Sequence, residues 1–150
     1  RNISNLRHAV SLLGQRTLRL TALTFCLVDN LSKGVGELFY QQYWKKSLAT
    51  ASFGSRLAQF DRSVDRDAAY CAGLLADVGI LAFAQTQRIP YTAVFKQNPR
   101  SCDLVAAEQE RFGFHHAALG ARLLERWQFP MDNVIATRNH HLPVDARGPP

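Results

Sequence analysis

Apolar residues recur every three or four positions along almost the whole chain, which is the spacing of one face of an α-helix. No run of alternating apolar and polar residues is long enough to indicate a strand. The pattern therefore predicts an all-α fold. We expect a bundle of about seven to eight helices, over Ser4–Gly14, Gln15–Asn30, Glu37–Gln59, Asp65–Leu75 with its continuation Val78–Gln85, Tyr91–Gln97, Asp103–Phe112, Phe114–Trp127 and Pro130–His141.

Glycine and proline residues mark the breaks between these helices. The breaks fall at Gly14, Gly34 and Gly36, Pro90, Pro99, Gly113 and Pro130. Ser63 and Asp103 are placed to cap the helices that follow them, and Pro130 suits the first position of the last helix.

Small side chains form a stripe along the longest predicted helix, at Ser47, Ala51, Ser55 and Ala58. Gly73 lies inside another predicted helix, where glycine costs about 1 kcal/mol relative to alanine. A glycine at such a position usually marks close backbone packing. We therefore expect a second helix to approach the small stripe closely.

The composition is that of a folded domain. Of 150 residues, 47% are hydrophobic and 20% are charged, which is enough apolar material for one core. The last residues, 142–150, are rich in proline and glycine and carry no pattern, so they predict a flexible tail or linker. No continuous apolar run approaches the roughly 18 residues that span a membrane, and we expect no membrane partner.

Charge and cysteine content narrow the classes of function. The chain has 18 basic and 12 acidic residues, a net charge of +6, which invites a nucleic-acid interpretation. The basic residues are scattered, however, and this favours a solvated basic surface over a nucleic-acid-binding patch. The three cysteines lie far apart without a Cys-x-x-Cys motif, as is typical of reduced thiols in a cytoplasmic protein.

One short stretch carries the pattern of a metal site that lacks a ligand. Residues Leu74–Gly79 read Leu-Leu-Ala-Asp-Val-Gly, which is similar to the signature Leu-Leu-His-Asp-Ile-Gly of HD-type phosphohydrolases. The histidine and aspartate of that signature bind a divalent metal that activates water. Ala76 cannot bind a metal, so the stretch indicates the framework of a hydrolase whose catalytic metal site has been lost.

Further segments match the same family in the same order. Trp44–Ala51 is similar to its Trp-x-His-Ser-x-x-x-Ala helix, and Leu123–Pro130 to its Leu-Leu-x-x-Trp-x-x-Pro. Glu108, Gly113, His116 and Gly120 match Glu-x4-Gly-x2-His-x3-Gly, and the pair His140–His141 closes the series. From about Ile3 to His141 the chain resembles the HDOD domain, the HD-related output domain of bacteria.

The resemblance implies a helical bundle of the HD-domain type. The helices that usually precede Ile3 in the family are missing from the match. We therefore expect residues 1–141 to form an HDOD-like domain without its N-terminal part, followed by the tail 142–150. The resemblance also implies that Lys46, Ser47, Asp77, His116, His140 and His141 line a vestigial pocket.

Several ligand positions of active HD relatives hold other residues here. Lys46 stands where the first histidine would be, Ala76 replaces the second, and Ile80 replaces a lysine that some active relatives carry. A lysine ammonium has no lone pair and repels a cation. We therefore expect no metal and no other cofactor.

If a metal binds, its ligands come from Asp77, His116 and the pair His140–His141. Neighbouring helical residues point about 100° apart, so we expect only one of that pair to face the site. Three ligands suffice to hold zinc.

Other roles compete for these residues. Asp77 can be a buried carboxylate paired with Lys46, which would then replace the charge of the metal. His116 and His140 can be hydrogen-bonded histidines of the pocket wall. The interface candidates are Trp44, Trp127, Arg122 and Arg126, although tryptophans at helical spacing are also typical of a core or its rim.

The function that these observations favour is a non-catalytic, cytoplasmic signal-transduction module of bacteria. The resemblance implies protein–protein contact, with a signalling protein as partner and cyclic-dinucleotide-linked domains as companions. One alternative is a residual metal-dependent phosphohydrolase that acts on nucleotides or cyclic dinucleotides. The second is a basic, nucleic-acid-binding helical domain.

Overall fold

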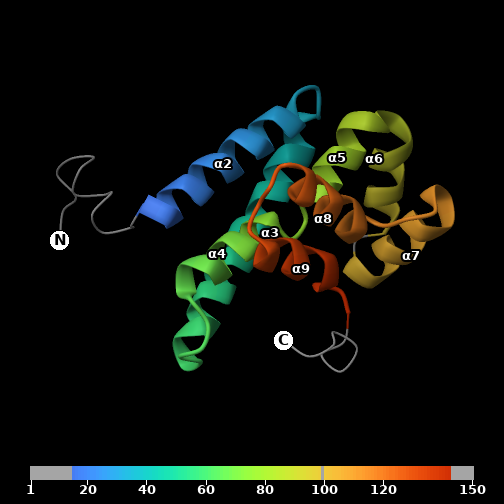
Figure 1. Cartoon of the computed structure of the whole chain (residues 1–150). Coiled ribbons are helices and arrows are strands. Elements are labelled where there is room, and N and C mark those ends of the chain that lie inside the picture. Colours follow the sequence, from blue (N-terminus) through green and yellow to red (C-terminus); the bar gives the residue numbers. More distant parts are fainter. Residues whose placement is uncertain (1–14, 99, 143–150) are drawn as a thin grey trace.

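The structure, a computed structural model, describes residues 15–98 and 100–142. Within these residues the chain forms eight α-helices and one short 3-10 helix (Figure 1). They are α2 (Gln15–Ser32), α3 (Glu37–Leu57), η1 (Ala58–Phe60), α4 (Arg66–Leu75), α5 (Val78–Thr86), α6 (Arg88–Gln97), α7 (Ser101–Phe112), α8 (His116–Arg126) and α9 (Met131–Asn139). These residues contain no strand, which confirms the all-α prediction. The predicted first helix, Ser4–Gly14, lies outside the described residues.

The small stripe on α3 is where α4 packs. Ser47 and Ala51 of α3 and Ala58 of η1 are buried, and a methyl group on Gly73 of α4 would lie 2.6 Å from the Cα of Ala51. The two helix backbones are therefore in direct contact, because neither helix carries a side chain between them. The predicted close approach is confirmed.

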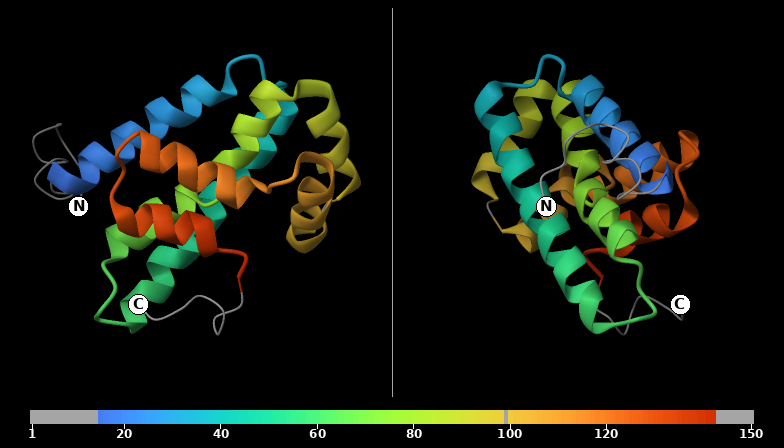
Figure 2. Two further views of the ribbon diagram at one scale, coloured as in Figure 1. Left: turned by 45° about the vertical axis from the view of Figure 1, so that its right-hand side comes forward. Right: turned by 90° about the vertical axis from the view of Figure 1, so that its left-hand side faces the viewer.

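A second glycine crossing joins α5 to α8. A Cβ atom on Gly79 would overlap the carbonyl oxygen of His116 and would lie 2.8 Å from the backbone nitrogen of Gly120. Gly79 follows Asp77 by two positions, so this crossing also brings the Asp77 backbone close to the start of α8. Figure 2 shows α8 and α9 as a helical pair that packs on α4 and α5.

Two predicted caps, Ser63 and Asp103, and the predicted position of Pro130 are wrong. Asp65, not Ser63, caps α4, because its carboxylate accepts a hydrogen bond from the Ala68 N–H at 2.7 Å. The Ser63 N–H and hydroxyl both donate to Asp61 instead. Helix α7 begins earlier than expected, so Asp103 falls in its first turn and pairs with Arg100. Pro130 sits one position before the first residue of α9 rather than on it.

The last helix ends earlier than its pattern predicts. Helix α9 stops at Asn139 and His140 is its C-cap. His141 therefore follows the helix, where the angular rule for successive helical residues no longer applies.

Helices α4 and α5 form the apolar centre of the bundle. Together they make the segment Arg66–Thr86, which is long and apolar enough to cross a membrane, with a mean hydropathy of 1.5. From the sequence we expected no apolar run long enough to span a membrane, and this segment was missed. In the fold, 67% of its most apolar window is buried, and Asp77 interrupts it. We therefore interpret it as the core of the bundle.

Replacing Gly79 by alanine tests the crossing of α5 and α8. The added methyl group has no room against the His116 carbonyl, so we expect a loss of about 1–3 kcal/mol or more in the free energy of unfolding, measured by urea denaturation. Gly36→Ala is the matched control, because a methyl group there meets nothing within 4 Å. It should cost less than about 1 kcal/mol. Equal losses in both variants would contradict the close approach.

Candidate functional site

Asp77, His116, His140 and His141 converge on one point of the fold. Asp77 joins α4 to α5, His116 is the first residue of α8, and the two adjacent histidines follow α9. One ligand atom from each of the four lies within 4.8 Å of the others. We call these four residues the histidine cluster.

Both residues of the His140–His141 pair belong to the cluster, and the prediction that only one would do so is wrong. The reason is the early end of α9. His140 is the C-cap and His141 lies in the turn beyond it, so the chain direction changes between the two residues. Both rings can then face the same carboxylate.

The two oxygens of the Asp77 carboxylate have different partners. Oδ2 lies 3.0 Å from the Nζ of Lys46 on α3. Oδ1 lies 3.3 Å from the Nε2 of His116 and 3.3 Å from the Nε2 of His140. Asp77 is buried, whereas the Lys46 side chain is 43% exposed. The ammonium thus compensates a buried carboxylate from the rim of the site, as a paired charge in an interior requires.

A buried carboxylate on α7 fixes the orientation of His116. Oε2 of Glu108 accepts from both the backbone N–H and the Nδ1–H of His116, each at 2.7 Å. The Tyr91 hydroxyl donates to Oε1 of Glu108 at 2.6 Å. All three residues are fully buried. Because Nδ1 carries the proton shared with Glu108, Nε2 is the nitrogen that faces the cluster.

His140 is oriented in a similar way by the backbone. Its Nδ1 lies 2.8 Å from the carbonyl oxygen of Thr137, and a carbonyl can only accept, so Nδ1 is the donor. The Nε2 of His140 and the Oδ1 of Asp77 that it faces are both buried, and neither has a hydrogen-bond partner in this part of the chain. Two acceptors so placed repel each other unless a proton or a metal ion lies between them.

The electrostatics of the site follow from burial and charge together. Burial by itself would raise the pKa of Asp77, but the imidazoles of His116 and His140 and the charge of Lys46 outweigh it and hold that pKa well below its usual range. Burial likewise opposes the charging of His116, yet Asp77 and Glu108 outweigh it and raise the pKa of His116. Burial, with the charges of the other two histidines, lowers the pKa of His141 to about 3. These effects favour the neutral imidazole of His141.

The other residues predicted for the pocket lie around the cluster. Ser47 is buried one position after Lys46, and its hydroxyl makes no hydrogen bond to the cluster. Ala76 caps α4 and is buried. Ile80 belongs to the apolar core, so it supplies no charge where some active relatives carry a lysine.

The interface candidates differ in exposure. Trp44 packs against the core, with its ring stacked on Phe25 at a centroid distance of 5.4 Å. Trp127 is exposed and lines a hollow of about 430 Å³ together with Leu23, Cys26, Leu27, Asn30 and Phe129. Arg122 and Arg126 are exposed on α8.

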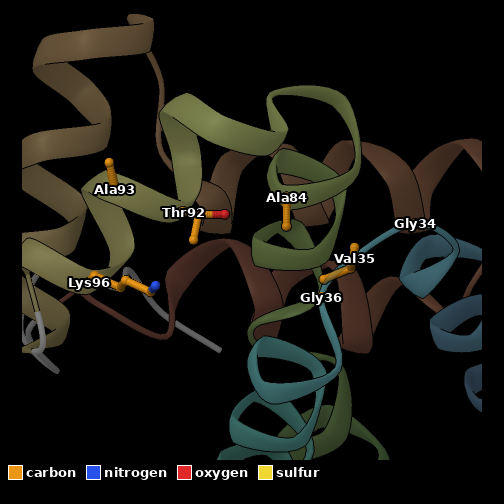
Figure 3. A pocket seen from close by; sticks show the side chains of 7 residues that line it. All are labelled: Gly34, Val35, Gly36, Ala84, Thr92, Ala93 and Lys96. Atoms are coloured by element: carbon orange, nitrogen blue, oxygen red, sulfur yellow. The ribbon is translucent and has the colours of Figure 1, made fainter.

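Another hollow, also of about 430 Å³, lies between the turn after α2 and helix α6 (Figure 3). It is lined by Gly34, Val35, Gly36, Ala84, Thr92, Ala93 and Lys96. None of these residues belongs to the histidine cluster. The cluster is therefore a packed arrangement of side chains separate from this hollow.

The role of Tyr91 was not predicted from the sequence, and Glu108 was matched to a family motif without a role in the site. One signal was available for Glu108, because it lies four residues after Leu104 and four before Phe112 on the apolar face of α7. A carboxylate on such a face is usually buried and paired. No local pattern links Tyr91 to Glu108, since the two residues lie on different helices.

Comparison with known proteins gives one match. The family model of the HDOD domain matches residues 1–143. No curated protein matches the chain, and no solved structure does so. The motifs around Asp77, His116 and His140 thus lie within a match that covers nearly the whole sequence.

Removal of the Tyr91 hydroxyl tests the buried network. Tyr91→Phe keeps the ring and leaves Oε1 of Glu108 without its donor, so we expect a loss of about 1–3 kcal/mol in the free energy of unfolding. Tyr40→Phe is the matched control, because Tyr40 is only partly buried; it should change stability by less than about 0.5 kcal/mol. A neutral Tyr91→Phe in urea denaturation would contradict the hydrogen bond to Glu108.

Proposed function

The chain belongs to the HDOD family, and we propose that it is a non-catalytic, cytoplasmic signal-transduction module of bacteria that acts by protein–protein contact. In this proposal the histidine cluster is what remains of an HD-type hydrolytic site. The companions of the module would be signalling proteins, including domains linked to cyclic dinucleotides.

The contact between Lys46 and Asp77 carries the proposal. With its Nζ 3.0 Å from Oδ2, the ammonium takes one of the two carboxylate oxygens that a hydrolytic metal centre could use. Ala76 offers no ligand beside it, and Ile80 is part of the core. The chain thus holds a lysine ammonium next to the aspartate and lacks the histidine of the His-Asp pair.

The phosphohydrolase alternative needs an open coordination position for water. Catalytic zinc sites use three protein ligands and leave the fourth position to water, whereas four protein ligands are typical of structural sites. The cluster offers four. A metal held by all four would have no place for the water to be activated, which supports a non-catalytic role.

We expect no metal-dependent hydrolysis of nucleotides or cyclic dinucleotides by the wild-type chain, whether Mg²⁺, Mn²⁺ or Zn²⁺ is supplied. The measurement is product release by chromatography over long incubations, with Asp77→Asn as the control that sets the background. Turnover above that background, lost on addition of a chelator, would overturn the non-catalytic proposal.

The surface of α8 and α9 supports a protein partner. Trp127, Met131 and Ile135 are large apolar side chains with 42%, 58% and 49% of their surfaces exposed. Arg122 and Arg126 lie on α8 just before them. Exposed aromatic and aliphatic side chains beside arginines are the composition of protein interfaces. The partner that would suit this surface carries apolar anchors next to acidic residues.

Charge reversal on α8 tests this surface. Arg122→Glu with Arg126→Glu should weaken capture of the partner by at least about tenfold, because like charges then face its acidic residues. The domain should still fold, since both arginines are exposed. Arg62→Glu with Arg66→Glu makes the same change of charge on the loop before α4 and at its start, and should leave capture unchanged.

The measurement is affinity capture from an extract of the native cell, quantified by mass spectrometry for the wild type and the two double variants. The nucleic-acid alternative is tested with unrelated DNA duplexes at increasing salt. If the α8 variant captured the same proteins as the wild type, while the wild type bound DNA with a steep salt dependence, the nucleic-acid alternative would replace our proposal.

A further inference from the structure

Four potential ligand atoms meet in the histidine cluster, and two of them, Oδ1 of Asp77 and Nε2 of His140, have no hydrogen-bond partner among the described residues. Nδ1–H of His116 is committed to Glu108, and Nδ1–H of His140 is committed to the Thr137 carbonyl. When its Nε2 is unprotonated, each of these two rings presents a lone pair to Oδ1 of Asp77, at 3.3 Å. The Nε2 of His141 lies 2.8 Å from that of His116. The arrangement calls for a cation at its centre.

We propose that the histidine cluster is a closed, four-ligand site for a divalent transition-metal ion of the zinc class. The ligand atoms are Oδ1 of Asp77, the Nε2 atoms of His116 and His140, and a ring nitrogen of His141. Three imidazoles and one carboxylate are a donor set for zinc and similar ions, whereas magnesium and calcium prefer oxygen ligands.

Two of the separations between the ligand atoms match tetrahedral coordination, and all four atoms lie within 4.8 Å of one another. Metal–nitrogen bonds of about 2.0–2.1 Å place neighbouring ligand atoms of a tetrahedron about 3.3 Å apart. The two contacts of Asp77 Oδ1 already have this length. The 2.8 Å separation of the His116 and His141 nitrogens must widen by roughly 0.5 Å to reach that edge. His141 is partly exposed in a turn after α9, so it is the ligand that can move.

Lys46 does not block this site. Its ammonium contacts Oδ2 of Asp77, whereas the histidines gather at Oδ1. A metal on Oδ1 leaves the ion pair with Lys46 in place. From the sequence we expected Lys46 to exclude a metal from the whole carboxylate. In the structure the two carboxylate oxygens have separate partners, so Lys46 occupies only Oδ2.

The residues behind the ligands favour metal binding as well. Glu108 and the Thr137 carbonyl hold Nδ1–H of two of the rings. Histidines that bind metals in proteins are held in this manner by a carboxylate or a carbonyl, which fixes the ring orientation and raises ligand basicity. Both carboxylate oxygens of Glu108 accept hydrogen bonds, Oε1 from the Tyr91 hydroxyl and Oε2 from the His116 backbone N–H. These hydrogen bonds thus already fix the orientation of two of the ligand rings.

A metal here would join the centre of the bundle to its last helices. The ligands come from the junction of α4 and α5, the start of α8 and the end of α9. With every position filled by protein, the ion would have a structural or regulatory role. This inference goes beyond the proposed function and is independent of it, because metal binding does not require a partner and does not confer hydrolysis.

The test uses the untagged full chain, stripped with a chelator and titrated with Zn²⁺ and Co²⁺. We expect one ion per chain by calorimetry, and an intense visible absorption typical of four-coordinate Co²⁺. At a Zn²⁺ concentration of about 100 times Kd, Tm should rise by about 5–10 °C. Mg²⁺ should have no effect at the same concentration.

Two variants separate the cluster from a neighbouring histidine. His140→Ala removes a ligand and should weaken Zn²⁺ binding by at least about 10–100-fold, the range seen when even the supporting residues of a metal site are lost. His115→Ala is the matched control, because His115 adjoins His116 but lies outside the ligand set. Its affinity should remain that of the wild type. Circular dichroism of each stripped protein shows that the fold is retained.

Either of two results would overturn the proposal. One is a wild-type chain with neither stoichiometric Zn²⁺ binding nor a rise in Tm, in which case protons alone satisfy the cluster. The other is equal Zn²⁺ affinity in His140→Ala and wild type. If His140→Ala fails to fold, His141→Ala replaces it, since His141 follows the last helix and is partly exposed. Neither result bears on the hydrolysis assay, so failure of this inference and failure of the proposed function can be told apart.

Discussion

The buried carboxylate of Asp77 is the constraint on which the rest of the structure depends. It interrupts the most apolar segment of the chain, at the junction of α4 and α5. An isolated charge in that position would be very costly. The surrounding elements each bring a compensating group: Lys46 from α3, His116 from the start of α8 and His140 from the end of α9. Polar groups from three helices thus converge on one carboxylate.

Glycine makes that convergence geometrically possible. The absence of side chains at Gly73 and Gly79 lets α4 and α5 lie directly against the backbones of α3 and α8. Lys46 precedes the α3 crossing by five residues, and Asp77 precedes the α5 crossing by two. Gly113, with φ of 80°, ends α7 in the left-handed region that glycine adopts readily. The turn after it returns the chain so that Glu108 on α7 meets His116 on α8. Packing and site geometry are thus set by the same small residues.

Much of the fold is local in origin and could be predicted from the sequence. Helical periodicity, the small stripe on α3 and the glycine of α4 depend on residues that are close together in the chain. The caps could not be predicted as well, because Ser63 and Asp65 are both able to cap and only the geometry of the Asp61 turn decides between them. The cluster was predicted in part. Its members came from motifs, but the position of His141 depends on where α9 ends, and the role of Tyr91 depends on contact between separate helices.

The single ammonium of Lys46 does not balance the negative charge of the site. The interior holds two carboxylates, Asp77 and Glu108, against one ammonium, Lys46, which leaves one negative charge to be met. A proton on His116 meets it in one state, consistent with the raised pKa of that residue. The divalent ion that we propose at Oδ1 would meet it in another state, and would then displace that proton because only neutral imidazole binds a metal. In our proposal, proton and metal therefore compete for the same lone pairs.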